Sequence, residues 1–223
     1  MTPLRRVGAI GDVHAESDTL EVALTTLRRR GVDAILQVGD IVDGEGDIER
    51  TLELLQAPDV LGVRGNHERW LLQDTVRSLP FAHARSELSE RALFHVESLP
   101  TTRMLATMTG RAMLCHGVGE DDMAKLLPEH DISALADIPA LRALVDAGEY
   151  EWMVAGHTHK RMARVFGGVR VVNAGTLCRA DGAGFCEIDF ESERVTWFDV
   201  DERGRVREMG GGKIEPEPAW WAF

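Results

Sequence analysis

Short apolar runs alternate with helical patterns along the N-terminal half of the chain. The runs at 5–12, 33–40 and 59–66 are almost continuously apolar, which predicts strands buried on both faces of a sheet. The segments between them carry apolar residues at helical spacing, and a further helix is expected from about Glu68. This order favours parallel strands covered by helices, because parallel neighbours need a crossover connection.

The predicted helices carry start and stop signals. In the helix expected over 16–31, Ser17 or Asp18 is suited to capping the first turn, and Gly31 is suited to ending the last one. Asp47 is expected to cap the next helix in the same way.

The second half of the chain is expected to contribute mostly strands. Hairpins are predicted at 103–117, 163–175 and 184–200, with a further strand over 150–157. We expect these strands to form a second sheet that faces the first. The acidic stretch 119–149 is interpreted as a loop with short helices.

One domain over residues 1–208 and a short C-terminal tail over 209–223 account for the whole chain. A length of 223 residues suits a single domain with a sizeable core. The tail begins in a glycine run and carries Trp220 and Trp221, which we expect to pack on the domain or at a subunit contact.

Five predicted strands end in the same kind of motif, a glycine close to residue types that bind metals. The motifs are GDVH at 11–14, GDIVD at 39–43, GNHE at 65–68, CHG at 115–117 and GHTH at 156–159. Their candidate ligands are Asp12, His14, Asp40, Asn66, His116, His157 and His159. Because the carboxyl ends of strands in an open α/β sheet converge on one crevice, we expect these side chains to meet there.

Each motif alone has an ordinary explanation as a helix cap, a turn or a packed histidine. Together they would crowd one crevice with polar groups, and burying such groups without partners is costly. A metal centre removes that cost. Seven groups suit two ions that share one carboxylate, and mixed nitrogen and oxygen ligands favour manganese, iron, zinc, cobalt or nickel over calcium. Two such ions clamp a phosphate ester and generate hydroxide from water.

Composition and charge narrow the class of partner. A formal net charge of −12 argues against a broad nucleic-acid-binding surface, although bound cations would reverse the sign locally. The chain shows no signal peptide and no apolar run long enough to span a membrane, so a cytoplasmic protein with reduced cysteines is expected. A small phosphate ester, with neither nucleic acid nor membrane, is the expected partner. The oligomeric state is left open.

Taken in order, the five motifs resemble those of the calcineurin-like metallophosphoesterase superfamily, in particular its short bacterial-type members. The resemblance covers about residues 7–177. It implies an α/β fold, a four-layer αββα sandwich with two central mixed β-sheets. It also implies two divalent ions, with manganese preferred. One ion would take Asp12, His14, Asp40 and His159, and the other Asp40, Asn66, His116 and His157, so that Asp40 bridges them.

The resemblance further implies a catalytic pair, His67 and Asp43. His67 would act on the leaving group as a general acid or contact the phosphate, and Asp43 would orient it. Glu68 is either part of this site or an ordinary carboxylate at a helix N-terminus. Asn173 would belong to a structural turn beside the ligands.

Departures from the family pattern separate the candidate functions. The Ser/Thr protein phosphatases of the superfamily carry an arginine where this chain has Gly44, and a glycine where it has Ala15. The leading hypothesis is therefore a dinuclear metal-dependent phosphoesterase that acts on a small phosphodiester or nucleotide. A protein phosphatase, a phosphomonoesterase and a metal-poor interaction scaffold are the alternatives. Every ligand position is filled, which disfavours the scaffold, while the superfamily by itself leaves the substrate open.

Overall fold

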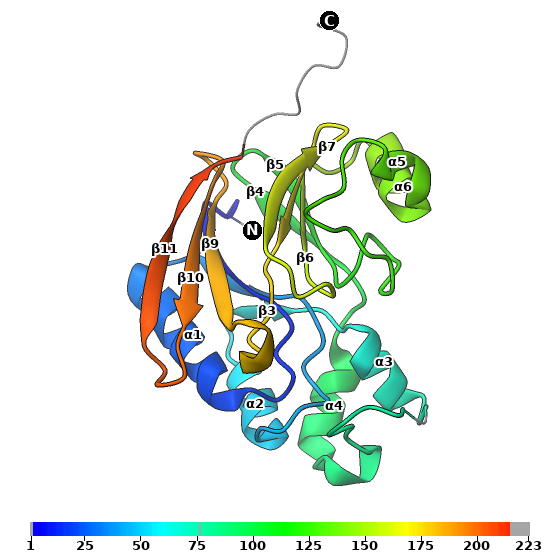
Figure 1. Cartoon of the computed structure of the whole chain (residues 1–223), viewed down its shortest axis with the longest axis vertical. Helices are drawn as coiled ribbons and strands as arrows, with labels where there is room; N and C mark the ends of the chain where they lie inside the picture. Colours follow the sequence, from blue (N-terminus) through cyan, green and yellow to red (C-terminus); the bar gives the residue numbers. More distant parts are fainter. Residues whose placement is uncertain (1, 76, 215–223) are drawn as a thin grey trace, which may run out of the picture.

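Two β-sheets lie face to face in the centre of the molecule, with helices on their outer faces (Figure 1). The computed structural model describes residues 2–75 and 77–214. The helices are α1 (Ser17–Arg30), α2 (Ile48–Leu55), α3 (Asn66–Leu72), α4 (Glu90–Ser98), α5 (Ala134–Asp137) and α6 (Pro139–Ala147), with short 3₁₀ turns η1 (Arg85–Glu87) and η2 (Arg179–Asp181). The predicted four-layer αββα sandwich is thereby confirmed.

The first sheet joins strands from both ends of the chain. Its order is β11 (Val206–Lys213), β10 (Arg194–Val200), β9 (Gly184–Asp189), β1 (Arg6–Ile10), β2 (Ala34–Gln37) and β3 (Val60–Gly62). β1, β2 and β3 are parallel, as predicted, whereas β9 pairs antiparallel with β1. The expectation that the hairpin at 184–200 belongs to the second sheet was therefore wrong. Its apolar pattern suits either sheet, and the contact with β1 is a tertiary choice.

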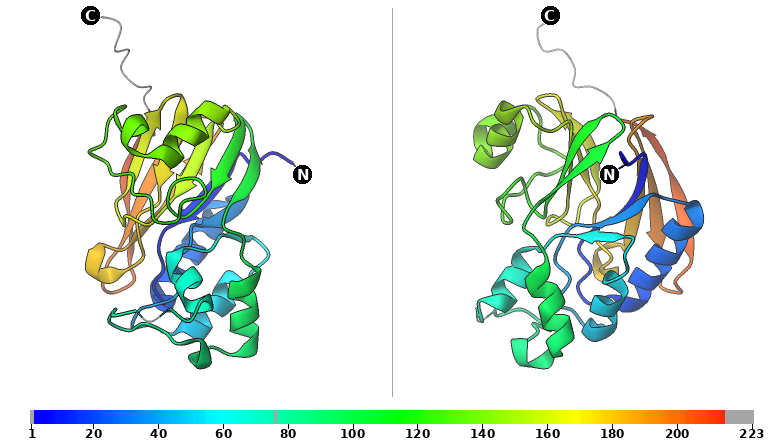
Figure 2. Two further views of the ribbon diagram at one scale, coloured as in Figure 1. Left: turned by 90° about the vertical axis from the view of Figure 1, so that its right-hand side faces the viewer. Right: turned by 180° about the vertical axis from the view of Figure 1, so that it is seen from behind.

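The second sheet contains only strands from the middle of the chain. Its order is β4 (Arg103–Thr107), β5 (Gly110–Leu114), β6 (Trp152–Ala155), β8 (Val169–Asn173) and β7 (Met162–Phe166). The predicted hairpins β4–β5 and β7–β8 are present, and β5, β6 and β8 are parallel. Figure 2 shows α5 and α6 on the outer side of this sheet.

Side chains along the strands alternate between two layers of core. Val7 of β1 packs between the sheets, while Ile10 packs with residues of α1 outside the first sheet. In the second sheet, Trp152 lies between the sheets and Met153 faces the apolar residues of α6. Burial on both faces is the physical reason for the continuous apolar runs in these strands.

The helix ends agree only in part with their sequence signals. Asp47 caps α2 by accepting a hydrogen bond from the Arg50 N–H, and Gly31 ends α1 with φ of 72°. Neither Ser17 nor Asp18 caps α1, because the helix begins at Ser17 and Glu16 stands at the cap position without a side-chain bond.

The C-terminal segment continues the first sheet. β11 runs to Lys213, so the expected boundary between domain and tail at residue 208 falls inside a strand. Trp220 and Trp221 lie outside the described residues. None of the helices in the described part is long and apolar enough to cross a membrane. The three cysteines, Cys115, Cys178 and Cys186, are free thiols.

Candidate metal centre

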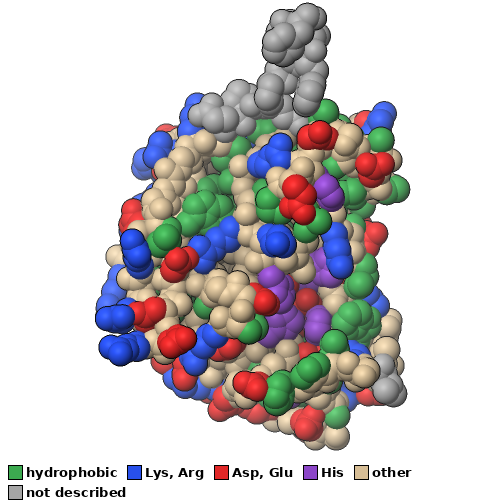
Figure 3. Space-filling view, in the orientation of Figure 1, with side chains coloured by type: hydrophobic (Ala, Val, Ile, Leu, Met, Phe, Trp, Pro, Cys, Tyr) green, Lys and Arg blue, Asp and Glu red, His purple; other side chains and the backbone are tan. Residues whose placement is uncertain are grey.

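The candidate ligands meet at one end of both sheets, as the strand-end pattern predicted. Their ligand atoms form three overlapping groups, and within each group the atoms lie within 4.8 Å of one another. The groups are Asp12–His14–His159, His14–Asp40–His67 and Asp40–His116–His157. Because His14 and Asp40 each belong to two groups, the three form one continuous centre. Figure 3 shows histidine side chains gathered on one face of the molecule, next to acidic side chains.

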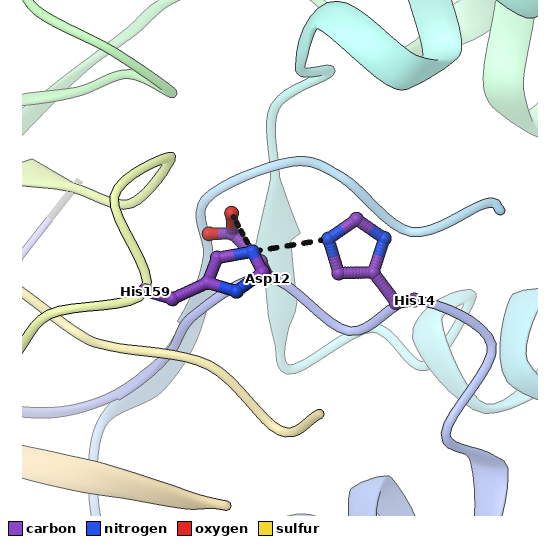
Figure 4. A group of neighbouring side chains, drawn as sticks. All are labelled: Asp12, His14 and His159. Atoms are coloured by element: carbon purple, nitrogen blue, oxygen red, sulfur yellow. Dashed lines mark hydrogen bonds and ion pairs between the residues drawn. The ribbon is translucent and has the colours of Figure 1, made fainter. Parts of the chain in front are cut away.

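His14 and His159 face each other across the first part of this centre (Figure 4). The Nδ1 atom of His14 lies 3.0 Å from the Asp43 carbonyl oxygen, and that of His159 lies 2.6 Å from an Asp181 carboxylate oxygen. Both Nδ1 atoms therefore carry a proton, and when neutral each ring directs its Nε2 lone pair into the crevice. The two Nε2 atoms are 3.2 Å apart. Two facing lone pairs repel unless a proton or a cation lies between them.

His116 has the same arrangement in the second part. Its Nδ1 donates to the Val38 carbonyl oxygen at 2.9 Å. Its Nε2 lies 2.9 Å from Asn66 Oδ1 and 3.1 Å from Asp40 Oδ2, both of which are acceptors. Asn66, which the three groups above do not include, is thus part of the same centre. Here too an ionised imidazole or a metal ion is needed to make the contacts favourable.

Two buried ligand atoms have no hydrogen-bond partner among the described residues. They are Asp12 Oδ2, which lies 3.1 Å from His159 Nε2 without accepting a hydrogen bond, and His157 Nε2. Leaving a buried polar atom unsatisfied costs about 1–3 kcal/mol. Both atoms are of the types that bind first-row divalent ions, so the residues present fit the dinuclear centre that the sequence predicted.

The electrostatics of the protein without metal reflect this crowding. Burial would lower the pKa of His116, but the charge and hydrogen bond of Asp40, together with the charge of Asp12 and the bond to Val38, outweigh it and raise the pKa to about 10. Burial also opposes ionisation of His159, yet the carboxylates of Asp12 and Asp181 beside its ring raise its pKa to about 9. For Asp40, burial raises the pKa, but the neighbouring His116 holds it well below its usual range. The pKa of His157 is lowered by burial and by His116.

The backbone at the site is strained. The candidate residues with φ in the left-handed region, between 46° and 68°, are His14, Asp40, Asp43, His157 and His159. Residues other than glycine rarely adopt this conformation, which costs about 1–3 kcal/mol each and clusters at functional sites. Glycine is required where the carboxylates approach the chain. A Cβ at Gly65 would lie 2.2 Å from Asp40 Oδ1, and one at Gly156 would lie 2.3 Å from Asp12 Oδ1.

Glu68 has a larger role than the sequence indicated. It stands in the first turn of α3, but it is fully buried and its carboxylate accepts hydrogen bonds from four backbone N–H groups. The donors are Asp40, Ile41, Val42 and Gly65. Glu68 therefore fixes the strained loop that carries Asp40 against the start of α3. The signal in the sequence was the fixed spacing of Glu68 within GNHE.

Asn173 supports the loop that carries His157 and His159. Its side-chain amide donates to the Gly156 carbonyl oxygen at 2.6 Å and to Thr158 Oγ1 at 3.1 Å. Its own carbonyl oxygen accepts from the Gly175 N–H. The residue is buried, and its contacts are those of a structural turn beside the ligands.

His67 and Asp43 form a hydrogen-bonded pair at the edge of the centre. His67 Nδ1 lies 2.8 Å from Asp43 Oδ2, and His67 Nε2 lies 3.7 Å from Asp40 Oδ2. Burial lowers the pKa of His67, but its bond to Asp43 and nearby carboxylates outweigh this and raise it. His67 also packs against Trp70, with ring centroids 4.9 Å apart. Its Nε2 atom thus lies beside the Asp40 carboxylate, close to the candidate ligands.

Sequence reasoning missed Arg77, His83 and Asp181. Arg77 forms a two-point ion pair with Asp43, the His83 N–H donates to the same carboxylate, and Asp181 bonds to His159. Arg77 and His83 lie in loops, and Asp181 ends the short 3₁₀ turn η2. None of the three belongs to a motif or a periodic segment, so no local signal marked them. Two other arginines near the site pair with carboxylates, Arg69 with Asp122 and Arg161 with Asp199.

Comparisons with known proteins bear on the family and the fold of the chain. A protein-family model described as the calcineurin-like phosphoesterase superfamily domain matches residues 6–193. A metallophosphoesterase from Sphaerobacter thermophilus has a similar structure, with 22% identity, a TM-score of 0.67 and coverage of 89% of each chain. Yfce, a phosphoesterase from E. coli, is 16% identical with a TM-score of 0.55, and the match covers 94% of this chain and 100% of that one.

A third similar structure is Vps29 from Entamoeba histolytica, solved in complex with Zn²⁺. It is 18% identical, with a TM-score of 0.53, and the match covers 91% of this chain and 96% of that one. At these identities the structures show a shared fold. The family model spans most of the chain and includes all of the candidate ligands. The chain therefore belongs to the calcineurin-like phosphoesterase superfamily.

Proposed function

We propose that the protein is a dinuclear metal-dependent phosphoesterase that hydrolyses a small phosphate ester, either a phosphodiester or a nucleotide. The observation that carries this proposal is the continuity of the centre: Asp40 contributes to groups on both sides of it, as a bridging carboxylate would. One ion would be held by Asp12, His14, Asp40 and His159, and the other by Asp40, Asn66, His116 and His157. Manganese is the preferred ion, with iron, zinc, cobalt and nickel as alternatives.

When bound, two divalent ions would polarise the phosphoryl oxygens and lower the pKa of a water molecule that attacks phosphorus. The protein's own groups supply the rest. The hydrogen bonds to Nδ1 of His14, His116 and His159 keep each Nε2 directed into the crevice. His67, oriented by Asp43, would donate a proton from Nε2 to the departing oxygen, since an alkoxide leaves poorly without one.

The surroundings of the centre favour a small substrate. A cavity of about 900 Å³ adjoins His159 and Asp181, a size typical of small-molecule sites. Its charged side chains are of both signs: Lys160, Arg161, Arg179, Arg205 and Arg207 face Asp181, Asp199, Asp201 and Glu202. These residues do not form a continuous basic groove of the kind that binds a nucleic-acid backbone.

The structure also argues against a Ser/Thr protein phosphatase. A Cβ added at Gly44 would lie 1.9 Å from the His14 carbonyl oxygen, so this backbone has no room for the arginine that those enzymes carry there. The free guanidinium of that arginine is their phosphate contact. In this chain Arg77, the arginine that does contact the GDIVD loop, is occupied by Asp43.

The experiment that tests the function compares p-nitrophenyl phosphate with bis-p-nitrophenyl phosphate. Protein stripped of metal is assayed while Mn²⁺ is added in steps, and Asp40→Asn serves as the variant that lacks the bridging charge. We expect activity to return with Mn²⁺ in the wild type alone, and the ratio between the substrates separates a diesterase from a monoesterase. Tight metal binding without hydrolysis of either compound or of a nucleotide panel would support the scaffold instead.

A further inference from the structure

Arg77 is the most buried arginine among the described arginine–carboxylate ion pairs. Its side chain is 7% exposed, and that of its partner Asp43 is 2% exposed. The bond has two points: Nε lies 2.9 Å from Asp43 Oδ2, and Nη2 lies 2.9 Å from Asp43 Oδ1. Such parallel hydrogen bonds hold a carboxylate in one orientation more firmly than a single contact does.

The segment 77–83 contacts Asp43 at both of its ends. The His83 N–H donates to Asp43 Oδ1 at 2.8 Å, and His83 Nδ1 accepts from the Asp43 N–H at 2.9 Å. Arg77 Nη2 also donates to the His83 carbonyl oxygen at 2.7 Å, which closes the segment on itself. Both the backbone and the side chain of Asp43 are thereby fixed by residues that are distant from it in sequence.

The result is a carboxylate with no freedom to turn. Oδ2 accepts from His67 and Arg77, and Oδ1 accepts from Arg77 and His83. A buried carboxylate paired with a histidine alone would be costly, and the guanidinium compensates for its charge. Because the His67 Nδ1–H bonds to this fixed oxygen, the direction of His67 Nε2 is fixed as well.

We propose that Arg77, together with the backbone of His83, is a clamp that positions Asp43 and, through it, the proton-donating His67. This inference rests on the proposed function and concerns one step of it. As the bond from phosphorus to the leaving oxygen breaks, its electron pair goes to that oxygen, which takes the proton from His67 Nε2. The attacking water forms the new bond to phosphorus and releases a proton to solvent, and solvent returns a proton to His67.

The clamp acts on departure of the leaving group through the Asp43 carboxylate, a group separate from the Asp43 carbonyl oxygen that holds His14 Nδ1. It touches none of the seven candidate ligands through the side chain of Arg77. Loss of Arg77 should therefore lower the rate of hydrolysis only for substrates whose leaving oxygen needs a proton. A dinitrophenolate leaves without one, whereas an alkoxide does not.

The test measures kcat on two esters of the same phosphoryl group, one with a 2,4-dinitrophenyl and one with an alkyl leaving group, at saturating Mn²⁺. For Arg77→Ala we expect a loss of about tenfold or more on the alkyl ester and less than about twofold on the dinitrophenyl ester. Arg77→Lys keeps the charge without the two-point geometry and should lie between Arg77→Ala and the wild type. Circular dichroism checks that each variant is folded.

Arg28 offers a matched control. It forms the same two-point bond, to Asp59, at 2.7 and 2.9 Å, but on the surface at the end of α1. Arg28→Ala should leave both rates unchanged. Equal losses on both esters for Arg77→Ala, or no loss on either, would overturn the clamp while leaving the proposed function intact.

A second readout does not depend on activity. In protein labelled with ¹⁵N in the imidazole rings, the wild type should show His67 with a hydrogen-bonded Nδ1–H, as an imidazolium below its pKa and as the single Nδ1–H tautomer above it. Arg77→Ala should show a mixture of tautomers or exchange broadening, while Arg28→Ala should match the wild type. An unchanged His67 signal in Arg77→Ala refutes the clamp even if no substrate is hydrolysed, whereas inactivity of the wild type on every ester counts against the proposed function alone.

Discussion

His14 and His159 direct their Nε2 atoms at each other across 3.2 Å, although they are 145 positions apart in the chain. Each is turned into that position by a hydrogen bond at its other ring nitrogen, to the Asp43 carbonyl oxygen and to Asp181. The arrangement is unfavourable for two neutral imidazoles and favourable around a cation. In the protein without metal, the two Nε2 atoms therefore either bind a proton or repel each other.

The pH dependence of stability should reveal those protons. The pKa values of His116 and His159, about 10 and about 9 when folded, lie above the ordinary value of 6.5. A raised pKa stabilises the fold fully below about 6.5, and this stabilisation is lost as pH rises through 9 and 10. We expect the free energy of unfolding of metal-free protein, measured with urea, to fall between pH 7 and pH 10. The protein saturated with Mn²⁺ should show less of this fall, because bound imidazoles carry no Nε2 proton. A metal-free protein that gains stability over that range would contradict the prediction.

Asp181→Ala should weaken metal binding. Asp181 holds the Nδ1 proton of His159, and loss of such a supporting carboxylate typically lowers metal affinity by about 10–100-fold. Titration calorimetry with Mn²⁺ measures this directly. Asp199→Ala is the control, because Asp199 lines the same cavity but pairs with Arg161 and not with a ligand. Equal affinity for Mn²⁺ in the two variants would show that Asp181 does not support the metal site.

His67→Ala should lower turnover and leave metal binding intact. His67 lies within 4.8 Å of ligand atoms of His14 and Asp40, so its position alone is compatible with a ligand role. If it is a proton donor, kcat on an alkyl phosphate ester falls by about 10²–10⁴-fold while two Mn²⁺ ions per chain remain bound. Metal analysis of the purified variant decides between the roles, since loss of one ion would make His67 a ligand.

Glu68→Gln should destabilise the fold strongly. Its carboxylate accepts four backbone hydrogen bonds in a fully buried position, and an amide group offers only one acceptor oxygen for them. We expect a loss of roughly 3 kcal/mol in the free energy of unfolding. Glu49 is the matched control, because its exposed carboxylate accepts from the Ser89 N–H at the surface. A Glu68→Gln variant as stable as Glu49→Gln would show that the loop does not depend on this carboxylate.

Gly44→Arg should not create a protein phosphatase. The new Cβ would meet the His14 carbonyl oxygen at 1.9 Å, so the loop has to shift and His14 with it. We expect a lower melting temperature and weaker Mn²⁺ binding, without activity on phosphopeptides. Gly212→Ala is the control, since a Cβ there meets nothing within 4 Å. A stable Gly44→Arg variant with phosphopeptide activity would revive the alternative function.

The sequence by itself determined the layered α/β class, the parallel strands β1 to β3 and the set of candidate ligands. These follow from local rules: a strand buried on both faces is continuously apolar, and glycine beside Asp or His marks the end of such a strand. Two of these glycines also have a reason in the tertiary structure, since at Gly65 and Gly156 a carboxylate oxygen occupies the space that a side chain would need. The order of the five motifs along the chain was enough to identify the superfamily.

Only the tertiary structure decided which groups support those ligands and which sheet receives the late strands. The β9–β10 hairpin pairs with β1 at the edge of the parallel strands, and nothing in its alternation distinguishes one sheet from the other. Arg77 contacts Asp43 from a loop, across 34 positions, and Asp181 contacts His159 from the 3₁₀ turn η2, across 22 positions. Such contacts depend on how distant segments pack. The pattern of residues along the chain predicts local structure and does not show which distant segments come together.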